Sequence, residues 1–125
     1  MKKKKSLKSL ENKLDRSLSD YVRQKAADDG GTARCITCGK LDYWKDMDCG
    51  HYIKRQYKAT RWDIRNLGIQ CRKCNRFAGG RMDEFALHII QNQGLEVLEE
   101  LGRLKHTTRK WTREELEQEI QKYAQ

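Results

Sequence analysis

"CITC" at residues 35–38 and "CRKCN" at residues 71–75 are the two stretches that decide the fold. Each has the Cys-x-x-Cys spacing, which can place two thiolates on one tetrahedral zinc ion. We therefore expect a structural zinc ion held by four thiolates, those of Cys35, Cys38, Cys71 and Cys74. The alternative for such pairs is redox chemistry. A structural zinc site can contribute on the order of 10 kcal/mol to folding.

The composition suggests why a metal would be useful. The 125 residues are 37% hydrophobic and 36% charged, so one domain with a modest apolar core is expected. No apolar run approaches the roughly 20 residues that span a bilayer, and the segment after the opening lysines lacks the apolar core of a secretory signal. We therefore expect no membrane partner and a cytoplasmic protein, in which cysteines stay reduced and available to metal.

The positive charge is concentrated beside the cysteines. The chain carries a net charge of +9, and residues 54–81 contain nine basic residues against one acid. Such a stretch favours a polyanion partner, nucleic acid before membrane, although a merely solvated basic surface is the alternative. The candidate phosphate contacts are Lys54, Arg55, Lys58, Arg61, Arg72, Lys73 and Arg76.

The hydrophobic spacing predicts an α+β fold. Leucines at steps of three and four predict a helix over residues 6–28, whose stripe either packs on the core or forms a dimer interface. Residues 32–76 have no helical period and predict short strands around residues 36, 43–44, 52–53 and 67–69. Helices are expected after residue 72, from residue 85, from residue 95, and after a Thr112–Glu115 capping box.

The domain organisation follows from these elements. Residues 1–5 are expected to be a disordered basic tail, and residues 6–125 a single domain. Within that domain we expect a zinc-bearing core over about residues 32–82 and a helical part over residues 83–125.

The stretch "MDCGHYIKR", residues 47–55, places a histidine between the two cysteine pairs. Four thiolates satisfy zinc, so His51 is not needed as a ligand. A satisfied structural histidine is the simplest interpretation. Two other residues favour a functional one: Asn66 in "RNLGIQC" and Asn75, directly after the last cysteine.

The order Asp-x-Gly-His, Asn, Cys-x-x-Cys-Asn resembles the HNH or His-Me finger nucleases, whose ββα-metal core is a hairpin followed by a helix. The stretches "YVRQKAADDGGTARCITCGK", "DCGHYIKR", "TRWDIRNLGIQCRKCNRFAGG" and "GLEVLEEL" are similar to the phage NinG (Rap) recombination nucleases. This likeness covers roughly residues 20–101. The four-cysteine zinc followed by Asn is also similar to the phage recombination endonuclease VII group.

The resemblance implies roles for individual residues. His51 would be the general base, with its ring supported from the Asn66 region, and Asn75 would be a ligand of a catalytic Mg²⁺ or Mn²⁺. HNH enzymes commonly have an acid or histidine before the catalytic histidine, whereas this chain has Gly50. Asp48 is the nearest acid, and a bulge at Gly50 could turn it toward the ion; a turn or surface carboxylate is the alternative.

A further acid, Asp63, is more simply expected to pair with Arg61 beside a buried Trp62 than to bind the ion.

The resemblance also implies a function. It implies a zinc-containing, metal-dependent DNA endonuclease that hydrolyses phosphodiesters in branched recombination intermediates such as Holliday junctions and D-loops. A homodimer is expected because two cuts resolve a junction, and phage recombination proteins are possible partners in the host cytoplasm. The alternatives are a non-catalytic zinc-containing DNA-binding recombination accessory protein and a less selective HNH nicking endonuclease.

Overall fold

The structure is a computed structural model that describes residues 4–124. The expected basic tail falls largely on residues 1–3, which lie outside the described residues. The helices are α1 (Leu7–Ala26), α2 (Lys58–Arg61), α3 (Met82–Gln93), α4 (Leu95–Lys105) and α5 (Arg113–Tyr123). The strands are β1 (Thr32–Arg34), β2 (Leu41–Tyr43), β3 (Asp48–His51) and β4 (Leu67–Gln70). Short helical turns cover Trp44–Asp46, Ile64–Asn66 and Lys73–Phe77.

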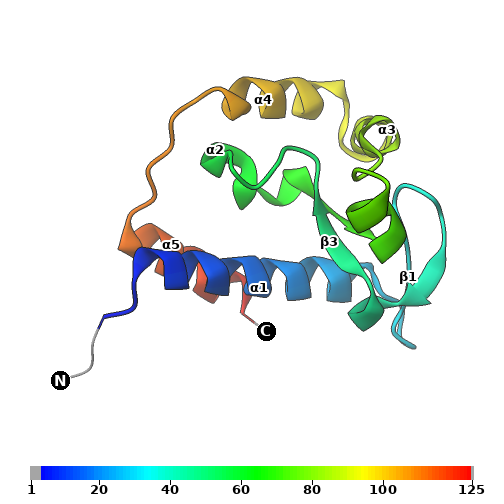
Figure 1. Cartoon of the computed structure of the whole chain (residues 1–125), viewed down its shortest axis with the longest axis horizontal. Coiled ribbons are helices and arrows are strands. Elements are labelled where there is room, and N and C mark those ends of the chain that lie inside the picture. The colour runs from blue at the N-terminus through cyan, green and yellow to red at the C-terminus, as the bar shows by residue number, and fades with distance from the viewer. Residues whose placement is uncertain (1–3, 125) are drawn as a thin grey trace.

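The N-terminal helix is confirmed and belongs to the core. Ser6 caps it by accepting a hydrogen bond from the Ser9 amide at 3.0 Å. Three leucines of its stripe are buried among side chains of α5, β4 and Trp62: Leu10, Leu14 and Leu18. Figure 1 shows α1 running along one side of the molecule with α5 beside it. Because these leucines are covered within the chain, the alternative that they form a dimer interface is wrong.

Two small antiparallel hairpins make up the β structure, as expected for a mixed α+β domain. β1 pairs with β2, and β3 pairs with β4 in the register Asp48↔Gln70 through His51↔Leu67. The pairing is one-to-one at all four positions, so the bulge considered as a possibility at Gly50 is absent.

Two expected strand positions lie outside the strands. Ile36 lies in the turn of the first cysteine pair, where the Gly39 amide bonds the Cys35 carbonyl at 3.0 Å. Residues 52–53 leave the hairpin directly after His51, and the segment that follows contains the unexpected helix α2. Bringing Cys35 and Cys38 to one point requires the chain to turn at Ile36 rather than continue as a strand.

The C-terminal helices follow the expectation. Thr112 and Glu115 form both bonds of a capping box at the start of α5. α3 begins at Met82, slightly before the expected start, and packs through Phe85 and Ile89 against Leu101 of α4. Among residues 4–124, no helix combines the length and apolar character needed to cross a membrane.

Candidate metal centre and basic hollow

The two cysteine pairs meet at one point of the fold. The sulfurs of Cys35, Cys38, Cys71 and Cys74 all lie within 4.8 Å of one another. Cys38 Sγ and Cys71 Sγ are 3.7 Å apart. A zinc tetrahedron with bonds of about 2.3 Å has edges of about 3.8 Å, so the spacing suits that ion. The cluster could therefore hold a zinc ion.

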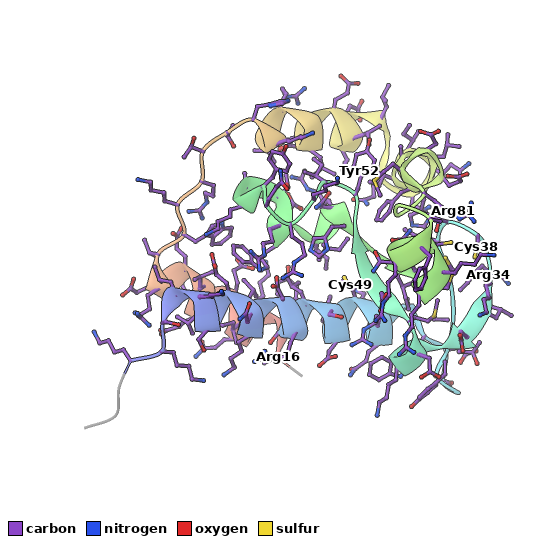
Figure 2. The ribbon with its side chains drawn as sticks, viewed as in Figure 1. Arg16, Arg34, Cys38, Cys49, Tyr52 and Arg81 are labelled. Carbon is purple, nitrogen blue, oxygen red and sulfur yellow. The ribbon has the colours of Figure 1, made fainter. Side chains whose placement is uncertain are left out.

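A cation supports this cluster from outside. Arg81 donates from Nε to Cys74 Sγ at 3.2 Å, and its backbone has a left-handed φ of 46° at the start of α3. Its positive charge would offset part of the negative charge of four thiolates. Figure 2 shows Arg81 at the same end of the molecule as Cys38. Sequence reasoning had counted Arg81 only within the basic run.

A hollow of about 900 Å³ opens beside this centre. Its walls come from α1, from β3 and the segment after it, and from the turn that follows Cys74. In Figure 2, Arg16 and Cys49 mark its α1 and β3 sides. Three acids line it against eight basic residues, which are Arg16, Arg23, Lys45, Lys54, Arg55, Arg61, Arg72 and Arg76. Such a surface attracts a polyanion.

His51 lies in the wall of this hollow, at the end of β3. Burial lowers the pKa of its imidazole to about 4, while the negative charge of Asp15 acts in the opposite direction. The ring is therefore neutral at neutral pH. A neutral imidazole can accept a proton.

Asp48 and Asn75 are joined in the same hollow. Asn75 donates from Nδ2 to Asp48 Oδ2 at 3.0 Å, and Arg76 donates from Nε and Nη2 to the same carboxylate at 2.8 and 2.9 Å. Burial acts to raise the pKa of Asp48, but the bonds from Arg76 and Asn75 outweigh it and lower the pKa. Asp48 is thus an ionised carboxylate in contact with Asn75, without any bulge.

The absence of a side chain at residue 50 has a physical reason. A Cβ atom on Gly50 would lie 2.0 Å from Gln70 Oε1, because the Gln70 side chain covers that position. Gln70 is buried, and its Nε2 donates to the Gly80 carbonyl at 2.8 Å, which fixes the orientation of the amide. Gln70 therefore fills the space that a side chain at residue 50 would need.

Asp15 of α1 is a site residue that sequence reasoning missed. It accepts hydrogen bonds from Arg61 Nη2 at 2.6 Å, Trp62 Nε1 at 2.8 Å and Arg55 Nη2 at 2.9 Å. Burial acts to raise its pKa, but these bonds and charges lower it. The spacing of the leucine stripe could have pointed to it, because Asp15 follows the buried Leu14 on the face of α1 that meets β3.

The prediction that Arg61 pairs with Asp63 is wrong. Asp63 bonds Arg65 instead, at 2.8 Å, and lies outside the hollow. Arg61 turns to α1 because Asp15 offers a half-buried carboxylate that also bonds the indole of Trp62. Trp62 is buried, as expected.

Comparison with known proteins identifies the family. The family described as Bacteriophage Lambda NinG protein matches residues 1–125, the whole chain. The chain belongs to the NinG family.

Relatives named protein ninG include one from Escherichia phage 933W, 29% identical over 110 residues, which are 87% of this chain and 52% of the relative. Those from Salmonella phage P22 and Escherichia phage lambda are each 28% identical over 100 residues, covering 79% of this chain and 46% of the relative. The chain thus spans about half the length of the NinG relatives it matches. No solved structure matches it.

In this NinG chain, Asn66 contacts other groups than the expected His51 ring. Its carboxamide accepts from the Ile53 amide at 2.8 Å and donates to the carbonyls of Ile53 and Thr60 at 3.0 and 3.2 Å. It is fully buried and holds the segment after His51, rather than the ring of His51 itself. Its support of the site is therefore through the backbone.

The structure separates the expected phosphate contacts of this NinG chain into two groups. Five line the hollow: Lys54, Arg55, Arg61, Arg72 and Arg76. Lys58 and Lys73 do not; Lys58 instead pairs with Glu11 at 2.8 Å, and Lys73 is exposed on the turn after Cys71.

Proposed function

We propose that this chain is a metal-dependent DNA endonuclease of the His-Me finger type that hydrolyses phosphodiesters in branched recombination intermediates, such as Holliday junctions and D-loops. The observation that carries the proposal is that His51, at the end of β3, and Asn75, in the turn that carries Cys74, line one basic hollow. In this proposal β3, β4 and the Lys73–Phe77 turn correspond to the two strands and the helix of the ββα-metal core.

The cysteine cluster would hold structural zinc, which orders the turn that carries Asn75. Cys74 is a member of the cluster and Asn75 is the next residue. The Asn75 amide also bonds the Cys71 carbonyl at 3.1 Å. A metal that fixes Cys71 and Cys74 therefore fixes the start of the Asn75 side chain as well.

A second, hard cation fits the residues at Asp48 and Asn75. The Asp48 carboxylate and the Asn75 carboxamide oxygen are the oxygen ligands that Mg²⁺ and Mn²⁺ prefer. Asn75 Nδ2 is directed at Asp48, so its Oδ1 faces elsewhere and accepts no hydrogen bond from residues 4–124. The ion would neutralise charge on the phosphate.

The chemistry assigned to the chain itself is proton transfer by His51. The neutral imidazole would accept a proton from a water molecule, whose oxygen attacks phosphorus as the bond to the leaving oxygen breaks. The leaving oxygen takes a proton from solvent. The arginines around the hollow would hold the phosphates flanking the cut site, and Asp15 would keep Arg55 and Arg61 in place for this.

The preference for branched DNA rests on the family resemblance and not on any base-reading motif. Resolution of a four-way junction takes two cuts, which favours a homodimer with two active sites. The leucine stripe of α1 is covered within the chain, so such a dimer would use another surface. Phage recombination proteins and the host cytoplasm remain the proposed partners and location.

The decisive experiment compares the parent protein with His51→Ala on labelled four-way junction, fork and linear duplex in Mg²⁺ at one salt concentration. The proposal expects cleavage of the branched substrates, and a loss of about a hundredfold or more in His51→Ala with DNA binding retained. Unchanged cleavage in His51→Ala would contradict the assignment of the base.

Two alternatives make different predictions in the same assay. A non-catalytic DNA-binding accessory protein would bind these DNAs and cut none. This alternative gains support from the Gln70 side chain over Gly50 and from the pairing of Asp48 with Arg76. A less selective nicking endonuclease would cut duplex and junction alike.

A further inference from the structure

Phe77 is the most exposed large hydrophobic side chain in the described part of the protein. Its exposed fraction is 83%, against 56% for Leu87 and 55% for Leu41. An aromatic ring left in water contributes nothing to the fold, because it buries no apolar area. Burial within the fold therefore does not explain the position of Phe77.

Phe77 lies within a segment that lines the basic hollow, and its own ring is not among the lining side chains. It ends the Lys73–Phe77 turn, and the residues around it in sequence line the hollow: Arg72, Asn75, Arg76, Gly79 and Gly80. Residues 72–81 hold four basic residues and no acid. Gly79 has a left-handed φ of 64°, and a Cβ there would meet nothing within 4 Å. The space beside Gly79, two residues from Phe77, is therefore open.

A nucleic acid strand matches both the exposed aromatic ring and the basic residues around it. The faces of nucleic acid bases stack on exposed aromatic rings, while the phosphates of the same strand pair with the surrounding arginines. A protein partner would have to supply acids for these basic residues as well as an apolar surface for the ring, whereas one nucleic acid strand carries both negative charge and base faces.

We propose that Phe77 stacks on a base exposed at the branch point of the DNA whose phosphates occupy the hollow. The inference rests on the proposed function, and it adds a residue that distinguishes branched from linear DNA. In a continuous duplex each base face is covered by its neighbours, and uncovering one has a cost. At a junction or fork, stacking is already interrupted, so Phe77 can gain a contact there.

The test measures binding of the parent, Phe77→Ala and Phe77→Trp to a four-way junction and to a linear duplex of the same length. Magnesium is left out so that no cleavage occurs, and 2-aminopurine replaces a base at the branch point to report stacking by its fluorescence. Leu87→Ala is the matched control, since Leu87 is an exposed apolar residue on α3. Circular dichroism confirms that each variant is folded.

The expected result is that Phe77→Ala binds the junction about tenfold more weakly, loses the 2-aminopurine signal and binds duplex within about twofold of the parent. Phe77→Trp retains both junction affinity and signal, and Leu87→Ala behaves as the parent. Equal junction binding by the parent and Phe77→Ala overturns the inference and leaves the proposed endonuclease standing.

Two other outcomes also overturn it. If Phe77→Ala alters sedimentation but not DNA binding, the ring belongs to a protein interface. If the parent binds no DNA in any form, the inference fails together with the proposed function.

Discussion

Asn75 Nδ2 donates to Asp48 Oδ2 at 3.0 Å across 27 residues of sequence. The bond joins the turn after the last cysteine to the first residue of β3, the strand that ends in His51. The cysteine cluster and the hairpin are thus connected through the candidate site itself. Events at the cluster should therefore be measurable at the hollow.

Removing one cysteine of the cluster should unfold the region that carries Asn75. We expect the parent to bind one zinc ion per chain and Cys74→Ser to lose it. A binding free energy on the order of 10 kcal/mol is comparable to the whole stability of a domain, so chelation should cause general unfolding. Metal analysis and thermal denaturation check this. Cys49→Ser, outside the cluster, is the control and should keep its zinc.

Cation binding at the Asp48–Asn75 pair should respond in opposite directions to two neighbouring substitutions. Asn75→Ala removes a ligand and should weaken Mn²⁺ binding by about tenfold or more. Arg76→Ala releases the Asp48 carboxylate from its ion pair and should strengthen Mn²⁺ binding. Electron paramagnetic resonance of Mn²⁺ measures both affinities, and exposed Lys73→Ala is the control. Equal affinity in the parent and Asn75→Ala would remove the proposed cation site.

The imidazole of His51 should titrate far below a free histidine. Burial lowers its pKa to about 4, so the folded state disfavours the proton that the unfolded chain accepts near 6.5. The stability that the neutral ring contributes is therefore complete above pH 6.5 and is lost as the pH falls toward 4. At pH 5 the loss amounts to about 2 kcal/mol of the free energy of unfolding.

Nuclear magnetic resonance titration of the ring gives the pKa of His51 directly. Denaturant unfolding of the parent and His51→Gln at pH 7 and pH 5 gives the linked free energy. A pKa near 6.5 would show that the ring is solvated.

Replacing Asp15 by Asn should destabilise the fold and change the hollow. The substitution removes the charge that pairs with Arg61 and Arg55, and we expect the free energy of unfolding to fall by about 2 kcal/mol. The same change should lower the pKa of His51 further, since the Asp15 charge raises it.

Urea unfolding and the His51 titration measure the two effects of Asp15→Asn. Glu11→Gln, which breaks only the pair with the half-exposed Lys58, should cost less than about 1 kcal/mol. An equal loss in the two variants would count against a special role for Asp15.

Adding a methyl group at two glycines should have opposite effects. Gly50→Ala forces a Cβ against buried Gln70 Oε1 and should lower stability by about 1–3 kcal/mol. Gly102→Ala, within α4 and with nothing inside 4 Å of the new Cβ, should raise stability by about 0.5–1 kcal/mol. Thermal unfolding compares them. A neutral Gly50→Ala would mean that Gln70 moves freely.

Local patterns in the sequence were sufficient for the four longer helices and for the cysteine cluster, but not for the short helix α2. The leucine spacing of α1, the Thr112–Glu115 capping box and the Cys-x-x-Cys pairs each reflect an interaction between residues close in the chain. The sequence also shows Asn75 directly after the last cysteine, whereas the roles of His51 and Asn75 came from the family resemblance. These features depend on periods and short separations, which a sequence shows directly.

Tertiary structure decided which partner each charged or polar side chain has. Arg61 pairs with Asp15, 46 residues away, and not with Asp63 as predicted. Asn66 bonds Ile53 and not the His51 ring. Gln70 fills the space above Gly50, and no local sequence pattern predicts this contact. Such pairings depend on which segments meet in space and on which half-buried carboxylate is in reach. The sequence alone therefore determined the longer helices and the four-cysteine cluster. The short helix α2, the ends of the strands and the contacts that shape the hollow were set only when α1, β3 and the Lys73–Phe77 turn packed together.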